Sequence, residues 1–414
     1  ILYYMILNGV MLMCIAFYCF LGDVYANKPP LADVSLDSGM LIQPYTNRGI
    51  GLFTLYNYDL LSSLYWRFDQ RISMIYKPAG VFVRGFLTGL LQNQYHLGEL
   101  YRIAYHELGH GTRAEAFGYR VMYSTSETEH VDSYYELLFD LLQYSTAITG
   151  AWAHYYDDLN VHDSVDASDE SLILSAGGVN NEMYLAQLIE NRFYDRRVTS
   201  VYDFYHYLSA KLAVDNYVSY EQDDPDFMGD MYRVRQRYKT KDIDITYPEL
   251  KRYNGYAILL SSSFWAFLDG WSRYVVKGID YIEYYEKFGF RLPDINFFLT
   301  SHGPSYHIQS GYRFADNTTV PFAVEYVFIG DQQIEYTMGL KRHWADHWLT
   351  QSEIRWGESV GLSQSFRYFL SSKLDMTLGL DLQQFKNLYG ERHIKTLTDG
   401  NHDLDIWFNV RFVL

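Results

Sequence analysis

The chain has few cysteines and no concentration of basic residues. Its 414 residues include two cysteines, Cys14 and Cys19, which both lie near the N-terminus. A disulfide-stapled scaffold, a thiolate enzyme and a cysteine-ligated zinc site are therefore excluded for the rest of the chain. Lys and Arg number 34 against 50 Asp and Glu, which gives a net charge of −16 at pH 7. Binding to a nucleic-acid backbone needs a clustered basic face, so we expect no nucleic-acid partner.

The N-terminal segment has the layout of a secretory signal peptide. Met5 to Leu21 is apolar and uncharged, and Val24 and Ala26 are small residues at the −3 and −1 positions of a cleavage site. We therefore predict a signal peptide over residues 1–26 and an exported protein. The alternative is an uncleaved membrane anchor.

Two regions of different periodicity follow the predicted signal peptide. Residues 27–290 contain mainly helical patterns, with apolar residues every three or four positions, and we assign them to one domain. From about residue 293 apolar and polar residues alternate instead. The fold class is therefore α+β, a mainly helical domain followed by an antiparallel β-barrel of about eight strands over residues 291–414. The expected strands are residues 293–300, 305–314, 320–328, 333–341, 348–356, 359–370, 373–383 and 404–414.

Alternation does not say which face of the predicted barrel is wet. A soluble barrel encloses its apolar side chains, whereas an outer-membrane barrel turns them to lipid. The predicted signal peptide and the length of the apolar faces favour the membrane. The final segment Trp407–Leu414 also resembles the C-terminal strand of bacterial outer-membrane barrels. We therefore expect an outer-membrane location with membrane lipid as a partner. The alternatives are a periplasmic or secreted protein and a soluble β-domain.

The most specific motif is His106-Glu107-Leu108-Gly109-His110. Two histidines four positions apart project from one face of a helix and can bind a single Zn²⁺ through their imidazole nitrogens. Glu107 then lies beside the open position of the metal, where a carboxylate can take a proton from water. The periodicity predicts a helix from Leu97 to Phe117 with both histidines on its buried face, and Gly118 ends it.

With Ala114 and Phe117-Gly118 after it, the motif resembles the active-site helix of the HExxH zinc metallopeptidases, the zincins, over about 20 residues. The resemblance implies that His106 and His110 bind zinc and that Glu107 is the general base. The segment is also similar to the site-2 protease type. The downstream aspartate motif of that family is not visible, however, and the helix is too polar to lie in lipid. We therefore expect a zinc metalloendopeptidase of the HExxH type rather than an intramembrane protease.

A catalytic zinc needs a third protein ligand. Metzincins place a histidine six residues after the second one, where this chain has Ala116. In the gluzincin arrangement the ligand is a Glu from a second helix. Glu182 lies on an otherwise apolar helix face, where burying a carboxylate is costly without a cation, and the preceding glycines permit close approach to the first helix. Glu182 is our candidate and Glu190 the alternative. Glu182 could also be an ordinary first-turn residue favoured by the helix dipole.

These features predict hydrolysis of a peptide bond by a metal-activated water. Glu107 accepts the proton of the water and passes it to the leaving amine. A Tyr or His should steady the oxyanion, and His130, His154 and Tyr184 are candidates. The predicted function is a zinc-dependent peptidase that acts on peptides or proteins and is anchored in or at the bacterial outer membrane. The alternative is a non-catalytic barrel protein, an adhesin or assembly module, whose helical domain binds a partner.

Overall fold

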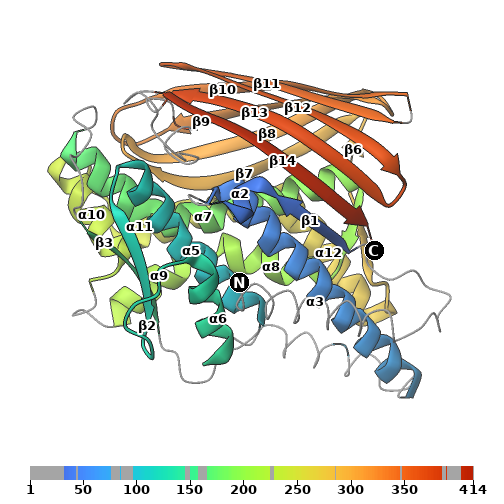
Figure 1. The fold of residues 1–414 in the computed structure, drawn as a ribbon, viewed down its shortest axis with the longest axis horizontal. Helices are drawn as coiled ribbons and strands as arrows, with labels where there is room; N and C mark the ends of the chain where they lie inside the picture. The colour runs from blue at the N-terminus through green and yellow to red at the C-terminus, as the bar shows by residue number, and fades with distance from the viewer. Residues whose placement is uncertain are drawn as a thin grey trace.

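The computed structural model describes residues 32–42, 45–75, 84, 97–144, 150–156, 166–223, 228–284, 286–345, 347–384, 388 and 402–413. Within them a layer of helices lies against one face of a large antiparallel sheet (Figure 1). The mixed architecture predicted from the sequence, helices first and strands after them, is confirmed. The predicted signal peptide over residues 1–26 lies outside the described residues.

The helix predicted around the histidine motif is present as α5, Leu97–Ala116. Gly118 follows it with φ of +86°, a conformation that glycine adopts without strain. Among the described helices, none is both long and apolar enough to cross a bilayer. The other helices are α2 (Ser38–Leu41), α3 (Asn47–Ile75), α6 (Tyr134–Gln143), α7 (Ala167–Arg196), α8 (Asp203–Lys211), α9 (Ala213–Asp223), α10 (Asp230–Thr240), α11 (Tyr247–Leu260) and α12 (Ser262–Lys277).

All eight strands expected after residue 290 are present. Together with two further strands they form a ten-stranded antiparallel sheet in the order β1-β14-β13-β12-β11-β10-β9-β8-β7-β6. Two further antiparallel pairs, β2–β3 and β4–β5, form separate two-stranded sheets. The strands are β1 (Asp33–Asp37), β2 (Arg120–Thr125), β3 (Ala151–Tyr156), β4 (Val198–Ser200), β5 (Tyr281–Glu283), β6 (Glu286–Lys287), β7 (Phe290–Thr300), β8 (Gly303–Ala315), β9 (Thr318–Val327), β10 (Ile334–Trp344), β11 (Trp348–Trp356), β12 (Val360–Ser371), β13 (Leu374–Gln384) and β14 (His402–Val413).

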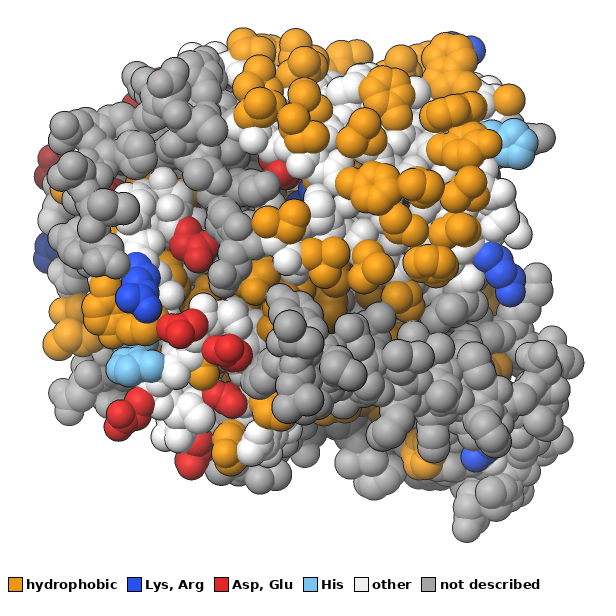
Figure 2. Space-filling view, in the orientation of Figure 1, with side chains coloured by type: hydrophobic (Ala, Val, Ile, Leu, Met, Phe, Trp, Pro, Cys, Tyr) orange, Lys and Arg blue, Asp and Glu red, His pale blue; other side chains and the backbone are white. Residues whose placement is uncertain are grey.

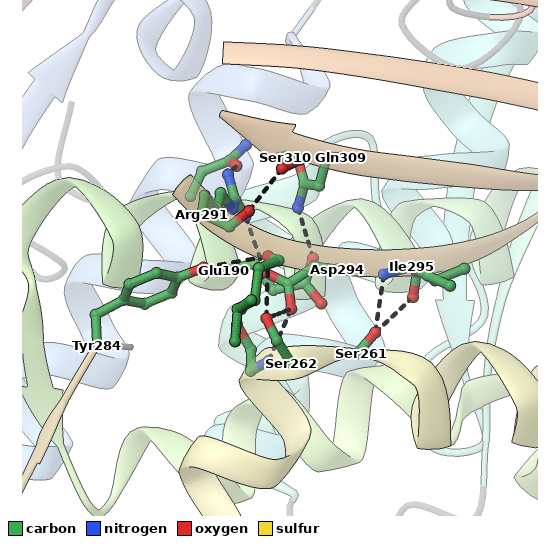
Figure 3. Close-up of polar contacts among 12 residues, drawn as sticks. Glu190, Ser261, Ser262, Tyr284, Arg291, Asp294, Ile295, Gln309 and Ser310 are labelled. Atoms are coloured by element: carbon green, nitrogen blue, oxygen red, sulfur yellow. Dashed lines mark hydrogen bonds and ion pairs between the residues drawn. The ribbon is translucent and has the colours of Figure 1, made fainter. Parts of the chain in front are cut away.

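The sheet is open over the described residues, so the expectation of a closed barrel is corrected. Its end strands, β1 and β6, do not pair with each other. Helix side chains bond the outer edge of β7 instead. The Ser261 hydroxyl accepts from the Ile295 N–H and donates to its carbonyl, both at 2.9 Å (Figure 3). The Asn180 side-chain amide bonds the N–H of Leu299 at 3.0 Å and its carbonyl at 2.8 Å. Backbone groups bonded in this way cannot pair with a closing strand.

Buried polar contacts join the helical layer to β7, and one runs from Lys211 Nζ of α8 to the Ile295 carbonyl at 2.6 Å. Lys211 Nζ lies 2.8 Å from Glu190 Oε1, and both side chains are fully buried. Arg291 pairs with Asp294 at 3.0 Å, and the Asp294 carboxylate also accepts from the backbone N–H of Ser263 (Figure 3). Buried charges destabilise a fold unless each has a partner of opposite sign, and these have one. The contact between the helices and β7 therefore contains paired buried charges beside the apolar packing of Phe297 and Leu299.

The sheet buries charged side chains on one face and exposes apolar side chains on the other, the opposite of the usual distribution in a sheet that faces water. Charged side chains such as Arg355 and Asp375 are buried on the face toward the helices. On the opposite face Met338, Leu378 and Ile406 are 51%, 54% and 62% exposed. Figure 2 shows hydrophobic side chains gathered over these strands. The alternation in the sequence left the orientation open, and the packing of the helices against the polar face decides it.

Candidate metal centre

Helices α5 and α7 cross closely beside the histidine motif. A Cβ atom at Gly109 would lie 2.4 Å from the carbonyl oxygen of Gly177, and one at Gly178 would lie 2.3 Å from His106 Nε2. Both distances are too short for any side chain, so these positions need glycine. The close approach expected from the glycines before Glu182 is confirmed. It brings α7 against the buried face of α5 that carries the histidines.

Three side chains converge at this crossing. His106 Nε2 lies 2.9 Å and His110 Nε2 3.1 Å from Asp230 Oδ2, and the two nitrogens are 3.2 Å apart. Ligands around a tetrahedral zinc with bonds of about 2.0–2.1 Å are about 3.3 Å from one another. The group formed by His106, His110 and Asp230 can therefore hold a metal ion with little rearrangement.

Hydrogen bonds on the far side of each ring fix the orientation of both histidines. His110 Nδ1 lies 2.7 Å from the carbonyl oxygen of Leu174, which can only accept, so Nδ1 carries the proton. His106 Nδ1 lies 2.7 Å from Glu182 Oε1, and a carboxylate likewise accepts. In the neutral ring the Nε2 lone pair is then free to bind a metal. Carboxylate and carbonyl partners of this kind are typical of metal-binding histidines.

Glu182, the expected third ligand, lies beside His106 but on the opposite side of the ring from Nε2. Its second oxygen pairs with Arg102, which also pairs with Glu99. The position next to the two Nε2 atoms is held by Asp230 instead. Glu190, the alternative ligand, belongs to the buried seam with β7. Sequence analysis missed Asp230 because an aspartate at the start of a helix is common for reasons of the helix dipole alone.

Glu107, the residue after His106, is buried near the histidine–aspartate group. Only 6% of the residue is exposed, and the backbone N–H of Ala153 in β3 bonds to its carboxylate. Burial raises the pKa of Glu107 to about 7, against the opposing effect of the nearby His106 and His110. A carboxylate poised near neutrality can both accept and return a proton at physiological pH.

Tyr217 of α9 is a site residue that sequence analysis missed. Its hydroxyl lies 2.9 Å from His106 Nε2, and its ring stacks on that imidazole with centroids 4.6 Å apart. Of the three residues expected near the oxyanion, His154 of β3 bonds Ser124 of β2 at 2.7 Å, and its ring centroid lies 6.1 Å from that of His130. The third, Tyr184, interacts electrostatically with Arg48, Asp381 and Arg355, and the last two belong to strands of the large sheet. With 41 tyrosines in the chain, no sequence signal could single out Tyr217.

The electrostatics of the group favour a cation at its centre. Burial opposes the charged form of His106, but the hydrogen bonds to Asp230 and Glu182 outweigh it and raise the pKa of the imidazole to about 10. Burial likewise acts to raise the pKa of Asp230, yet His110 and His106 lower it well below its usual range. A proton on His106 balances the negative charge of these carboxylates, and a divalent ion that displaced the proton would balance it as well. The Asp230 side chain is 17% exposed, so the group is within reach of solvent.

No family model matches the chain, and no curated protein or solved structure matches it. The geometry of the histidine–aspartate group and its surroundings therefore carries the functional assignment.

Proposed function

We propose that the protein is a zinc-dependent peptidase whose metal ligands are His106, His110 and Asp230. The observation that carries the proposal is the convergence of three ligand atoms within 3.2 Å, with both histidine Nδ1 atoms already engaged elsewhere. Two imidazole nitrogens and one carboxylate oxygen form a donor set typical of catalytic zinc, which keeps one further position for water or substrate. Glu182 then serves to orient His106 and to hold its proton on Nδ1.

Residues around the ligands supply the remaining steps of hydrolysis. A zinc ion bound there would make a water molecule nucleophilic near neutral pH and polarise a carbonyl group. Glu107 accepts the proton of the attacking water and delivers it to the leaving amine. The hydroxyl of Tyr217, close to His106 Nε2, donates a hydrogen bond to the oxyanion that develops on the carbonyl.

The antiparallel pair of β2 and β3 favours a peptide as the substrate. Tyr123 of β2 exchanges two backbone hydrogen bonds of 2.8 Å with Val131, so its backbone groups point away from β3. In an antiparallel pair the opposite residue, Ala153, then points its own groups away from β2, and its N–H meets Glu107. Within the described residues β3 pairs with a strand on one side only. An extended peptide can add to its other edge and pass directly over the base.

Metal removal tests this function. We expect the purified full-length chain to hold about one zinc ion and to cleave an unfolded protein substrate such as labelled casein. Treatment with a chelator should stop cleavage, and added Zn²⁺ should restore it. Metal content by elemental analysis and cleavage by fluorescence give the two readouts. Cleavage that continues at full rate in the metal-free protein would exclude the proposed mechanism.

Replacing Tyr217 by phenylalanine tests the oxyanion role. The change removes the hydroxyl and keeps the ring that stacks on His106, so zinc should stay bound and KM should change little. Loss of one oxyanion donor typically lowers kcat by about a hundred- to a thousandfold. Tyr220→Phe is the matched control because Tyr220 lies on the same helix and is 62% exposed. Loss of zinc together with activity would instead make Tyr217 a metal ligand.

A further inference from the structure

The exposed face of the sheet carries almost no charge. We define the outer face as the even-numbered positions of β9 to β14 whose side chains the structure describes; they lie on the side away from the helices. It holds one residue with a permanent charge, Arg342, whose guanidinium lies 4.0 Å from the ring centroid of Trp344 near the end of β10. The other Asp, Glu, Lys and Arg residues of these strands occupy odd-numbered positions. An apolar surface of this extent is unfavourable in contact with water and marks a site of interaction with a partner or a membrane.

In its strands β10 and β11, the outer face has aromatic residues at both ends. In the paired strands β10 and β11, Tyr336 is opposite Trp356 at one end, and Trp344 is opposite Trp348 at the other. Aliphatic residues such as Ile354 lie between them. The strand from Trp348 to Trp356 spans about 27 Å, close to the apolar band of about 25 Å in transmembrane sheets. Tyr and Trp rings at two levels, separated by aliphatic side chains, are typical of the two interfaces of a bilayer.

Several of the polar groups that a bilayer would expose have partners. Ser352 and Gln364, two polar residues in the middle of the outer face, are opposite each other and share a hydrogen bond of 2.5 Å. Ser261 and Asn180 bond backbone groups at the edge of β7. An open sheet is unfavourable in hydrocarbon mainly because its edge strands have unpaired backbone groups. The contacts of Ser261 and Asn180 give partners to the backbone groups of Ile295 and Leu299 at the β7 edge.

The apolar surface continues past that edge onto the helices. Leu259, Leu260 and Trp265, around the junction of α11 and α12, are 52%, 65% and 54% exposed. Ser261, which lies between them in the chain, is the residue whose hydroxyl bonds Ile295 of β7. The junction that caps the edge of the sheet therefore also extends its apolar surface.

We propose that the outer face of the sheet contacts the hydrocarbon of a phospholipid bilayer, with the strands crossing it and the two aromatic rows at its interfaces. A second copy of the chain is the other occupant to consider. A contact between two copies would not explain why tryptophan and tyrosine lie at two levels about 27 Å apart, or why the one arginine lies at one of these levels. Two membrane interfaces do, because they hold amphipathic rings and cations at the headgroups. This placement is independent of the metal centre and needs no catalysis.

Flotation with phosphatidylcholine vesicles tests the placement on the full-length chain. The parent protein should float with the vesicles and resist extraction by salt. Leu378→Lys puts a charge in the middle of the outer face, between Phe366 and Phe408, and should reduce the floating fraction at least tenfold. Val360→Lys is the matched control. Val360 is similarly exposed on the same face, but it is paired with Trp356 at the aromatic end, where a lysine can reach the headgroups, so flotation should persist.

A second measurement on the parent protein does not depend on how the variants fold. Vesicles of phosphatidylcholine brominated near the headgroup or deep in the acyl chain quench tryptophans at the corresponding depth. We expect stronger quenching by the shallow bromine, and the combined substitutions Trp344→Phe, Trp348→Phe and Trp356→Phe should remove most of the difference. A parent that stays out of the vesicles as a dimer overturns the proposal in favour of a second copy. Equal loss of flotation in both lysine variants, or stronger quenching by the deep bromine, overturns the crossing orientation.

Discussion

Glu107→Gln is expected to lower kcat/KM by about a hundred- to ten-thousandfold and to leave zinc bound. The amide keeps the size of the side chain and can still accept from the Ala153 N–H through its oxygen, but it cannot accept the proton of the attacking water. Glu107 is not among the three converging ligand atoms, so metal content should not change. Steady-state cleavage and elemental analysis, measured on the same preparation, separate the two effects.

The pH dependence of cleavage gives a second readout of the same base. Burial raises the pKa of Glu107 to about 7, so protonation as the pH falls removes the acceptor and lowers kcat/KM on the acid side. A bound divalent cation favours the carboxylate, so the midpoint in the zinc-loaded protein should lie below 7. This acid limb should disappear from the residual activity of Glu107→Gln.

Glu115→Gln is the control for the Glu107 variant. Glu115 lies on the same helix, and burial raises its pKa to about 7 as well, but it is not part of the histidine–aspartate group. Activity near that of the parent is expected. Equal losses in the Glu107 and Glu115 variants would point to damage of α5 rather than to loss of a base, and an active Glu107→Gln would refute the assignment.

Asp230→Ala should abolish stoichiometric zinc binding, whereas Glu182→Gln should only weaken it. Asp230 Oδ2 is the third converging ligand atom, and its removal leaves two imidazoles, too few for a stable zinc site. Glu182 holds the far side of His106, and loss of such a partner typically costs about 10- to 100-fold in metal affinity. Competition with a zinc-binding dye measures both.

The comparison decides between the ligand expected from the sequence and the one that the geometry favours. Complete loss of zinc in Glu182→Gln with retention in Asp230→Ala would restore Glu182 as the ligand. Circular dichroism of both variants is needed because Glu182 also pairs with the buried Arg102. Glu99 still pairs with Arg102 in the Glu182 variant, so the arginine keeps a partner.

Much of the fold follows from local pattern. The eight strands after residue 290 lie where alternating residues predicted them, because each strand with one apolar face has a period of two that the sequence records directly. The α5 helix and its end at Gly118 were equally legible, as were His106, Glu107 and His110 within it. A motif whose residues share one helix is a local feature, and its geometry is fixed by the helix alone.

Tertiary structure decided the rest. Asp230 is 120 residues from His110 in the chain, and its carboxylate reaches the histidines only because α10 and α7 pack together. Tyr217 comes from yet another helix.

The sequence by itself determined the eight strands after residue 290, the α5 helix and the placement of His106, Glu107 and His110 within it, since these depend on neighbours a few positions apart. The carboxylate of Asp230 as third member of the group, the exposure of the apolar face and the open sheet depended on how the helices pack on one another and on the sheet. Side chains such as Ser261 and Asn180 bond the edge of β7 from distant parts of the chain, and no periodicity records such contacts.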